Sequence, residues 1–106
     1  MTFKKGTFLI QMNHSKNYTV EERTGWISDD EVYGFHKEDD GWWIATDLST
    51  GACVTSAKTR KGCAEWLDEN KEHLNDVRHT EIYFSKVDFF AKNKLARLEK
   101  EKENEK

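Results

Sequence analysis

Four histidines and two cysteines are the side chains in this sequence best suited to bind a metal ion or to attack a substrate. They are His14, His36, His73, His79, Cys53 and Cys63. Zinc sites usually place such ligands at short spacings, as in C-x-x-C or H-x-x-x-H, and neither spacing occurs here. We therefore predict no metal site and no bound cofactor.

Catalysis without a metal would need an activated nucleophile or an acid–base pair. No flanking signature surrounds either cysteine, and Cys63 falls on the apolar side of a predicted helix. The alternative is a histidine–carboxylate pair, and His36 and Asp47 lie on neighbouring predicted strands. A small enzyme, for example one that cleaves RNA, would need a cleft joining these two residues. Because no catalytic motif accompanies them, we predict that the chain is not an enzyme.

Two adjacent tryptophans, Trp42 and Trp43, are the most informative apolar residues. Neighbours on a strand point to opposite faces of the sheet, so only one of them joins a one-sided core. The other is either exposed, where it anchors a partner or stacks on a base, or covered by the C-terminal helix. We expect Trp42, Trp43 and His36 to form the partner-binding site.

A compact basic cluster, Lys58, Arg60 and Lys61, lies at the start of the predicted helix. Cations at a helix N-terminus oppose the helix dipole, and contact with an anionic partner would explain their placement. The alternative is that Glu65 and Asp68, about one turn further along, neutralise the cluster and leave a solvated face. Both interpretations are open at this point.

The middle of the chain carries the clearest strand signals. Two β-compatible runs, 32–36 and 42–46, flank a turn at 38–41. That turn contains Asp-Gly, which is a strong hairpin signal between such runs. A second turn at 48–51 precedes a third run over 52–56. These segments predict a three-stranded antiparallel meander.

A helix follows the meander. Thr59 is placed to cap it, because a threonine hydroxyl can accept a hydrogen bond from a backbone N–H of the first turn. The residues that follow at helical spacing are Cys63, Trp66, Leu67, Asn70 and Leu74. We expect Trp66 and Leu67 to pack onto the sheet. Before the meander, 7–12 and 18–27 are further strand candidates, with Gly25 as a bend.

After the helix, residues 82–84 either extend a strand or begin another helix. From Val87 the apolar spacing indicates a helix, and Ser85 with Asp88 resembles a capping box at its start. The segment 99–106 contains only Lys, Glu and Asn, which can hold a solvated helix but bury nothing, so we expect it to fray.

Length and composition limit the fold to one core. The chain has 106 residues, of which 36% are hydrophobic, and six Phe, four Trp and three Tyr supply bulky side chains to bury. We predict an α+β fold: an antiparallel β-meander of three to five strands with a packed helix, then a second, C-terminal helix. Residues 1–98 form the single domain and 99–106 a charged tail.

The sequence also limits the compartment and the partners. No run approaches the ~20 apolar residues of a membrane span, and the N-terminus lacks the apolar core of a signal peptide. We therefore predict a cytoplasmic protein that does not contact membranes and keeps both cysteines reduced. The net charge of −3 argues against broad attraction to DNA but allows a local basic patch.

From residue 32 onward the sequence resembles the HicB-like antitoxin domain, in which a short β-meander feeds into a helix. The residues that carry the resemblance are Asp40, Gly41, Trp42, Trp43, Asp47, Leu48, Gly51, Thr59 and Ala64. Prolines that commonly flank the family's Asp-Leu turn are missing, and the turn at 47–53 is longer. The segment is also similar to small uncharacterised phage and prophage proteins of Gram-positive bacteria. The basic helix start is similar to that of double-stranded-RNA-binding domains.

We therefore expect a non-enzymatic protein-interaction module. The resemblance implies an antitoxin-like protein or inhibitor, encoded by a phage or prophage, that binds and occludes a host or cognate macromolecule. The alternative is a nucleic-acid-binding protein that uses Lys58, Arg60 and Lys61 on phosphates. The sequence does not indicate an oligomeric state.

Overall fold

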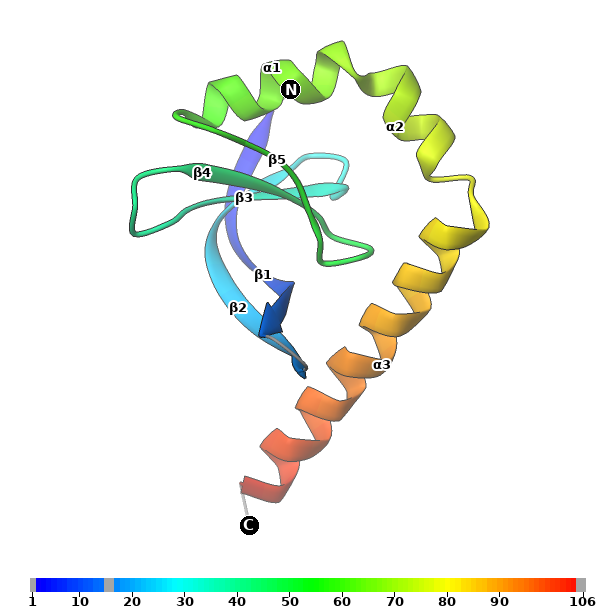
Figure 1. Cartoon of the computed structure of the whole chain (residues 1–106). Coiled ribbons are helices and arrows are strands. Elements are labelled where there is room, and N and C mark those ends of the chain that lie inside the picture. The colour runs from blue at the N-terminus through cyan, green and yellow to red at the C-terminus, as the bar shows by residue number, and fades with distance from the viewer. Residues whose placement is uncertain (1, 15–16, 105–106) are drawn as a thin grey trace.

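The computed structural model describes residues 2–14 and 17–104 and has an α+β fold, as predicted (Figure 1). The strands of the described ranges are β1 (Phe3–His14), β2 (Asn17–Ser28), β3 (Tyr33–Lys37), β4 (Trp43–Asp47) and β5 (Cys53–Ala57). The helices are α1 (Arg60–Glu69), α2 (Lys71–Val77) and α3 (Glu81–Asn104). All five strands form one antiparallel sheet in chain order. None of these helices is long and apolar enough to cross a membrane.

Both predicted turns join neighbouring strands, and each depends on a glycine with positive φ. In the β3–β4 turn the Gly41 φ is 91°, and Glu38 N–H donates to Trp42 O at 2.8 Å. In the β4–β5 turn the Gly51 φ is 69°, and its N–H donates to Asp47 O at 2.7 Å. Glycine adopts these angles without the steric cost of a Cβ, so the turn sequences fix the meander.

The β1–β2 hairpin is longer than its predicted strands and bends over the rest of the sheet. Its two strands pair over 12 residues each, but only Trp26 and Ile27 of β2 pair with β3. The distal half is therefore free to curl, and Figure 1 shows the bend. Gln11 N–H of β1 donates to Gly51 O of the β4–β5 turn at 2.7 Å, so the hairpin meets the far end of the meander.

Helix α1 covers one face of the sheet. Its Cys63 and Leu67 form the main buried cluster with Phe35 of β3 and Ala45 of β4. Trp43 packs against the same cluster, as does Leu74 of α2. The prediction that Trp66 and Leu67 pack onto the sheet is confirmed for Leu67, which is 2% exposed, whereas Trp66 lies outside this cluster and is 37% exposed.

The expected cap begins α1: Thr59 Oγ1 accepts from Gly62 N–H at 2.9 Å. The single helix predicted through Leu74 is instead interrupted at Asn70, whose side-chain amide donates to Trp66 O at 2.8 Å. An asparagine that satisfies a carbonyl of the last turn in this way competes with helix continuation. The chain therefore changes direction between α1 and α2.

Residues 82–84 lie in α3, which settles the choice between strand and helix. The predicted capping box at Ser85 and Asp88 is wrong, because the helix begins four residues earlier, at Glu81. Thr80 supplies the cap: its hydroxyl accepts from Tyr83 N–H at 3.2 Å. The charged segment from residue 99 continues the same helix through Asn104.

Three side chains hold α3 against the hairpin and the β4–β5 turn. Phe90 is buried beside Gly51, Asn93 donates to the Gln11 side chain at 3.1 Å, and Arg97 donates to Val20 O at 2.7 Å. Helix α3 therefore runs along one side of the sheet toward the hairpin tip and continues past it (Figure 1). It does not cover Trp43, which lies under α1.

The contact between Gly51 and Phe90 generates a stability prediction. A Cβ at Gly51 would lie 2.5 Å from the Phe90 ring and 2.8 Å from Gln11 N, whereas a Cβ at Gly41 would meet nothing within 4 Å. Both glycines have positive φ. We expect Gly51→Ala to lower the free energy of unfolding by about 1–3 kcal/mol more than Gly41→Ala, measured by urea denaturation. Equal losses in the two variants would show that the turn does not clamp α3.

Candidate functional site

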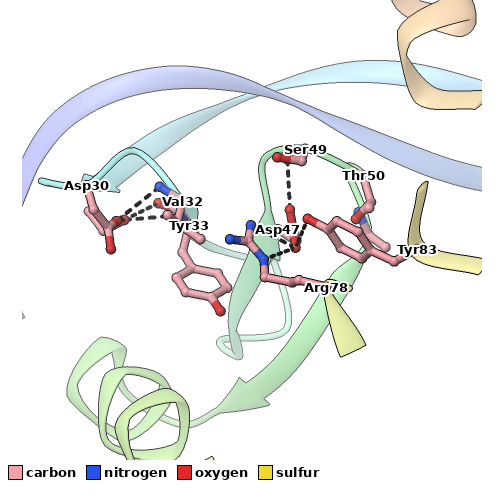
Figure 2. A network of polar contacts seen from close by, with 10 residues as sticks. Asp30, Val32, Tyr33, Asp47, Ser49, Thr50, Arg78 and Tyr83 are labelled. Atoms are coloured by element: carbon pink, nitrogen blue, oxygen red, sulfur yellow. Dashed lines mark hydrogen bonds and ion pairs between the residues drawn. The ribbon is translucent and has the colours of Figure 1, made fainter. Parts of the chain in front are cut away.

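The most connected polar group of the described chain is the carboxylate of Asp47, at the end of β4 (Figure 2). It is only 5% exposed. Its Oδ2 accepts from the Tyr83 hydroxyl at 2.9 Å and from Arg78 Nη2 at 3.2 Å, and its Oδ1 accepts from Ser49 N–H at 2.8 Å. One carboxylate therefore ties together β4, the β4–β5 turn, the α2–α3 connection and α3.

Arg78 donates hydrogen bonds to Asp47 and also makes cation–π contacts with two tyrosine rings. Its guanidinium lies 5.8 Å from the Tyr33 ring centre and 5.5 Å from that of Tyr83. Burial opposes the charge of Arg78, but the charge and hydrogen bond of Asp47, together with Tyr83 and Tyr33, outweigh burial and raise the pKa of Arg78. Arg78 therefore keeps its charge near neutral pH and forms an ion pair with Asp47.

Asp30 stabilises the neighbouring β2–β3 turn (Figure 2). Its Oδ1 accepts from the Ser28 hydroxyl at 2.6 Å and from Val32 N–H at 3.0 Å. Burial opposes ionisation of Asp30, but these two hydrogen bonds and the charge of Arg78 together lower its pKa. Asp30 therefore acts as a charged turn residue, a role for which aspartate is favoured.

Two cavities flank Arg78 beneath α2. The larger, of about 640 Å³, lies between the β2–β3 turn and α1–α2 and is lined in part by Asp30, Asp68 and Lys71. The smaller, of about 170 Å³, lies beside β5 and is lined in part by Cys53 and Tyr83. Tyr33 and Leu74 line both. Helix α2 thus rests on the sheet through few side chains.

The groups around these cavities are poorly suited to acid–base or nucleophilic chemistry near neutral pH. Burial, followed by the hydrogen bond and the charge of Asp47, raises the pKa of Tyr83. Burial likewise raises the pKa of the Cys53 thiol and that of the Cys63 thiol, which lies in the main buried cluster away from these cavities; both are free cysteines. All three groups therefore keep their protons, and the network works as a clamp between helices and sheet.

The structure separates His36 from Asp47. His36 is opposite Ile44 and Asp47 is opposite Tyr33, so the two point to opposite faces of the sheet. His36 is 2% exposed, with Nε2 at 2.7 Å from Glu38 Oε1 and its ring against Phe8. His36 therefore lies inside the fold and is not accessible to a partner, contrary to the prediction. His36 and Asp47 also do not form the shared cleft that the enzyme hypothesis requires.

The two adjacent tryptophans lie in different environments, although Trp42 precedes β4 and strand alternation therefore does not separate them. Trp43 is half-buried against the main cluster. Trp42, at the end of the β3–β4 turn, is 42% exposed. Of the three predicted partner-binding residues, the structure thus places Trp42 at the surface, Trp43 at the edge of the core and His36 inside.

The basic cluster at the start of α1 is divided between two environments. Arg60 lies over the rings of Trp26 and Phe3, at 4.4 and 4.9 Å from their centres. Lys61 lies 4.0 Å from Glu65, one helical turn away, as the neutralising alternative predicted. Lys58 is exposed. The tertiary structure adds Lys5, whose ammonium is 5.5 Å from the Trp26 ring centre.

No metal-binding group occurs in the described part of the chain. Among residues 2–14 and 17–104, no three or more His, Cys, Asp or Glu side chains converge as ligands. The side chain of His14, one of the four histidines considered above, lies outside the described residues. His79 Nδ1 is 2.7 Å from Asn75 O, which is a local contact at the end of α2.

Two sets of contacts were not predicted from the sequence: those of Asp47 with Arg78 and Tyr83, and that of Arg60 with Trp26. Arg78 and Tyr83 follow Asp47 by 31 and 36 residues, and no local pattern links residues so far apart. Trp26 and Arg60 are separated just as widely. A lone arginine between two helical segments was the only signal in the sequence for the contact of Arg78 with Asp47.

No family model, no curated protein and no solved structure matches this chain.

The clamp predicts how stability depends on alkaline pH. Tyr83 has a raised pKa in the folded state, against an ordinary value of 10.0, so its contribution is complete below that value and is lost as pH rises through the folded pKa. We expect Tyr83→Phe to lower the free energy of unfolding at neutral pH by about 1 kcal/mol. The variant should also lose less stability than the parent above pH ~10. Urea denaturation at both pH values measures this, and parallel pH profiles would contradict it.

Proposed function

We propose that this chain is a non-enzymatic interaction protein that binds one protein partner and occludes the partner's surface. The observation that carries the proposal is the exposed indole of Trp42 on a rigid turn. The resemblance to HicB-like antitoxins and to small phage or prophage proteins supports an antitoxin-like protein or inhibitor. Its partner would then be a host or cognate protein.

The β3–β4 turn is held by three hydrogen bonds, which orient Trp42 before binding. Glu38 N–H donates to Trp42 O at 2.8 Å, and Gly41 N–H donates to Glu38 O at 2.9 Å. Trp42 N–H donates to the Asp40 carboxylate at 2.9 Å. A tryptophan with an ordered backbone loses little conformational freedom on binding, so most of its burial contributes to affinity.

The charges beside Trp42 specify the chemistry of the partner. Asp39 and Asp40 are exposed on the same turn, three and two residues before Trp42. Charges at the edge of an interface orient the encounter and raise the association rate. We therefore infer that the partner carries an apolar pocket for the indole with lysine or arginine at its rim.

Substitution of Trp42 tests this proposal. The tagged protein is used to capture partners from the lysate of a Gram-positive bacterium treated with nuclease, and the retained protein is then purified for calorimetry. We expect Trp42→Ala to weaken binding at least about thirty-fold, which corresponds to the ≥2 kcal/mol of an interface hot spot. The turn is exposed, so the variant should fold, and circular dichroism checks this.

Trp66→Ala is the matched control, because Trp66 is the same residue type, is similarly exposed and lies on a different element, helix α1. It should bind like the parent. The proposal fails if no nuclease-resistant protein is retained, or if the two variants lose affinity equally.

A specific observation supports nucleic acid as a second candidate partner. Arg60 and Lys5 both lie against the Trp26 ring, so cations and an aromatic surface occur side by side near Lys58. Such a combination binds single strands by phosphate contact and base stacking. Arg60 also covers Phe3, however, so its guanidinium already contributes to packing within the fold.

Salt dependence tests the second candidate. If the cluster binds phosphates, affinity for a fluorescent single-stranded RNA should fall steeply between about 50 and 200 mM salt, and Lys58→Ala should reduce the slope by about one. The control is Lys71→Ala, an exposed lysine of α2 remote from the cluster in sequence. RNA binding that is insensitive to salt, or that both variants weaken equally, would contradict this candidate.

A further inference from the structure

Helix α3 exposes a stripe of apolar side chains that nothing in the described chain covers. Phe84, Leu95 and Leu98 are 55%, 60% and 52% exposed, and Ala91 is also exposed. Ala91, Leu95 and Leu98 are separated by four and three residues, which is the heptad spacing of a helix–helix contact, whereas Asp88 occupies the corresponding position between Phe84 and Ala91. The side of α3 that contacts the sheet is a different one, marked by Tyr83, Phe90 and Arg97.

The charged residues beside this stripe are arranged in two blocks. Lys92 and Lys94 flank Ala91 and Leu95, and Glu99 and Glu101 flank Leu98 and the next turn. In an antiparallel helix pair, equivalent flanking positions of the two helices face each other. Flanking positions that are basic beside Ala91 and Leu95 and acidic beside Leu98 therefore complement those of a second copy that runs in the opposite direction.

We propose that α3 binds α3 of a second copy of this chain as an antiparallel pair, with Leu95 of each copy against Leu98 of the other. In this register Lys92 faces Glu99 of the other copy, and Lys94 faces Glu101. The two-fold symmetry repeats each contact, so all flanking charges meet charges of opposite sign.

The same charges exclude the neighbouring registers. Shifting the pair by one heptad so that Leu95 meets Ala91 brings Lys92 against Lys92 and Lys94 against Lys94. The opposite shift, which pairs Leu98 with Lys102, brings Glu99 against Glu99 and Glu101 against Glu101. Like charges at facing positions are destabilising, so one register is selected.

Existing contacts of these residues leave the proposed interface accessible. Lys92 and Glu99 are exposed, and neither forms an ion pair within the described ranges. Glu101 lies 3.3 Å from Arg97 of its own helix, and Lys94 lies over the Phe90 ring at 4.6 Å. The pair between Lys92 and Glu99 therefore contributes more to the choice of register than the pair between Lys94 and Glu101.

Sedimentation equilibrium of the full chain tests the proposal. The parent should form a dimer of twice its 12.5-kDa mass at micromolar concentration, more weakly at high salt. Leu95→Asp should give a monomer at the same concentrations. Ala96→Asp, at an exposed position on another side of α3, is the matched control and should leave the dimer intact. A parent that is monomeric up to about a millimolar overturns the proposal.

A charge exchange tests the antiparallel register separately. Glu99→Lys should weaken the dimer about tenfold, because two attractive pairs become repulsive. Adding Lys92→Glu to that variant restores the attraction only if residue 92 faces residue 99 of the other copy. In a parallel pair Lys94 would face Glu99, so the double variant would stay weak, and that result would overturn the proposed arrangement.

Discussion

Burial of the Asp47 carboxylate is the constraint on which the arrangement of the helices depends. A buried charge is costly unless it is paired and hydrogen-bonded, and Asp47 obtains its partners from Ser49, Arg78 and Tyr83. Two of these partners come from beyond α1. The α2–α3 connection must therefore return to the end of β4, which sets the direction in which α3 leaves. Helix α2 has no buried residue of its own and is held by this connection and by Leu74, which packs against the main cluster.

The second contact of α3, between Phe90 and Gly51, follows from the first. Once Tyr83 is fixed on Asp47, two further turns of helix bring Phe90 to the β4–β5 turn. Gln11 of the long hairpin meets the same turn through its backbone. The hairpin, the meander and α3 thus converge on one glycine, and the other side of α3 faces away from the fold. The proposed self-association uses that free side, whereas the proposed partner site uses the separate β3–β4 turn.

Local signals in the sequence were sufficient for the meander and for the start of α1. Asp40-Gly41 and Thr50-Gly51 specify turns through residues that tolerate positive φ, and Thr59 specifies a helix start through its own hydroxyl. Each of these interactions lies within a few residues of the chain. The start of α3 was misplaced because Ser85 and Asp88 matched a local motif equally well, and Thr80 took the role instead.

The sequence by itself determined the α+β class and the two tight turns, because these follow from the hydrophobic pattern and from turn chemistry. Tertiary structure decided which groups are accessible. It placed His36 inside, stacked Arg60 on Trp26 and Phe3, and paired Asp47 with Arg78 across 31 residues. Burial and charge pairing depend on contacts between distant segments. Those contacts exist only after the hairpin has curled and α3 has docked, and no spacing along the chain encodes them.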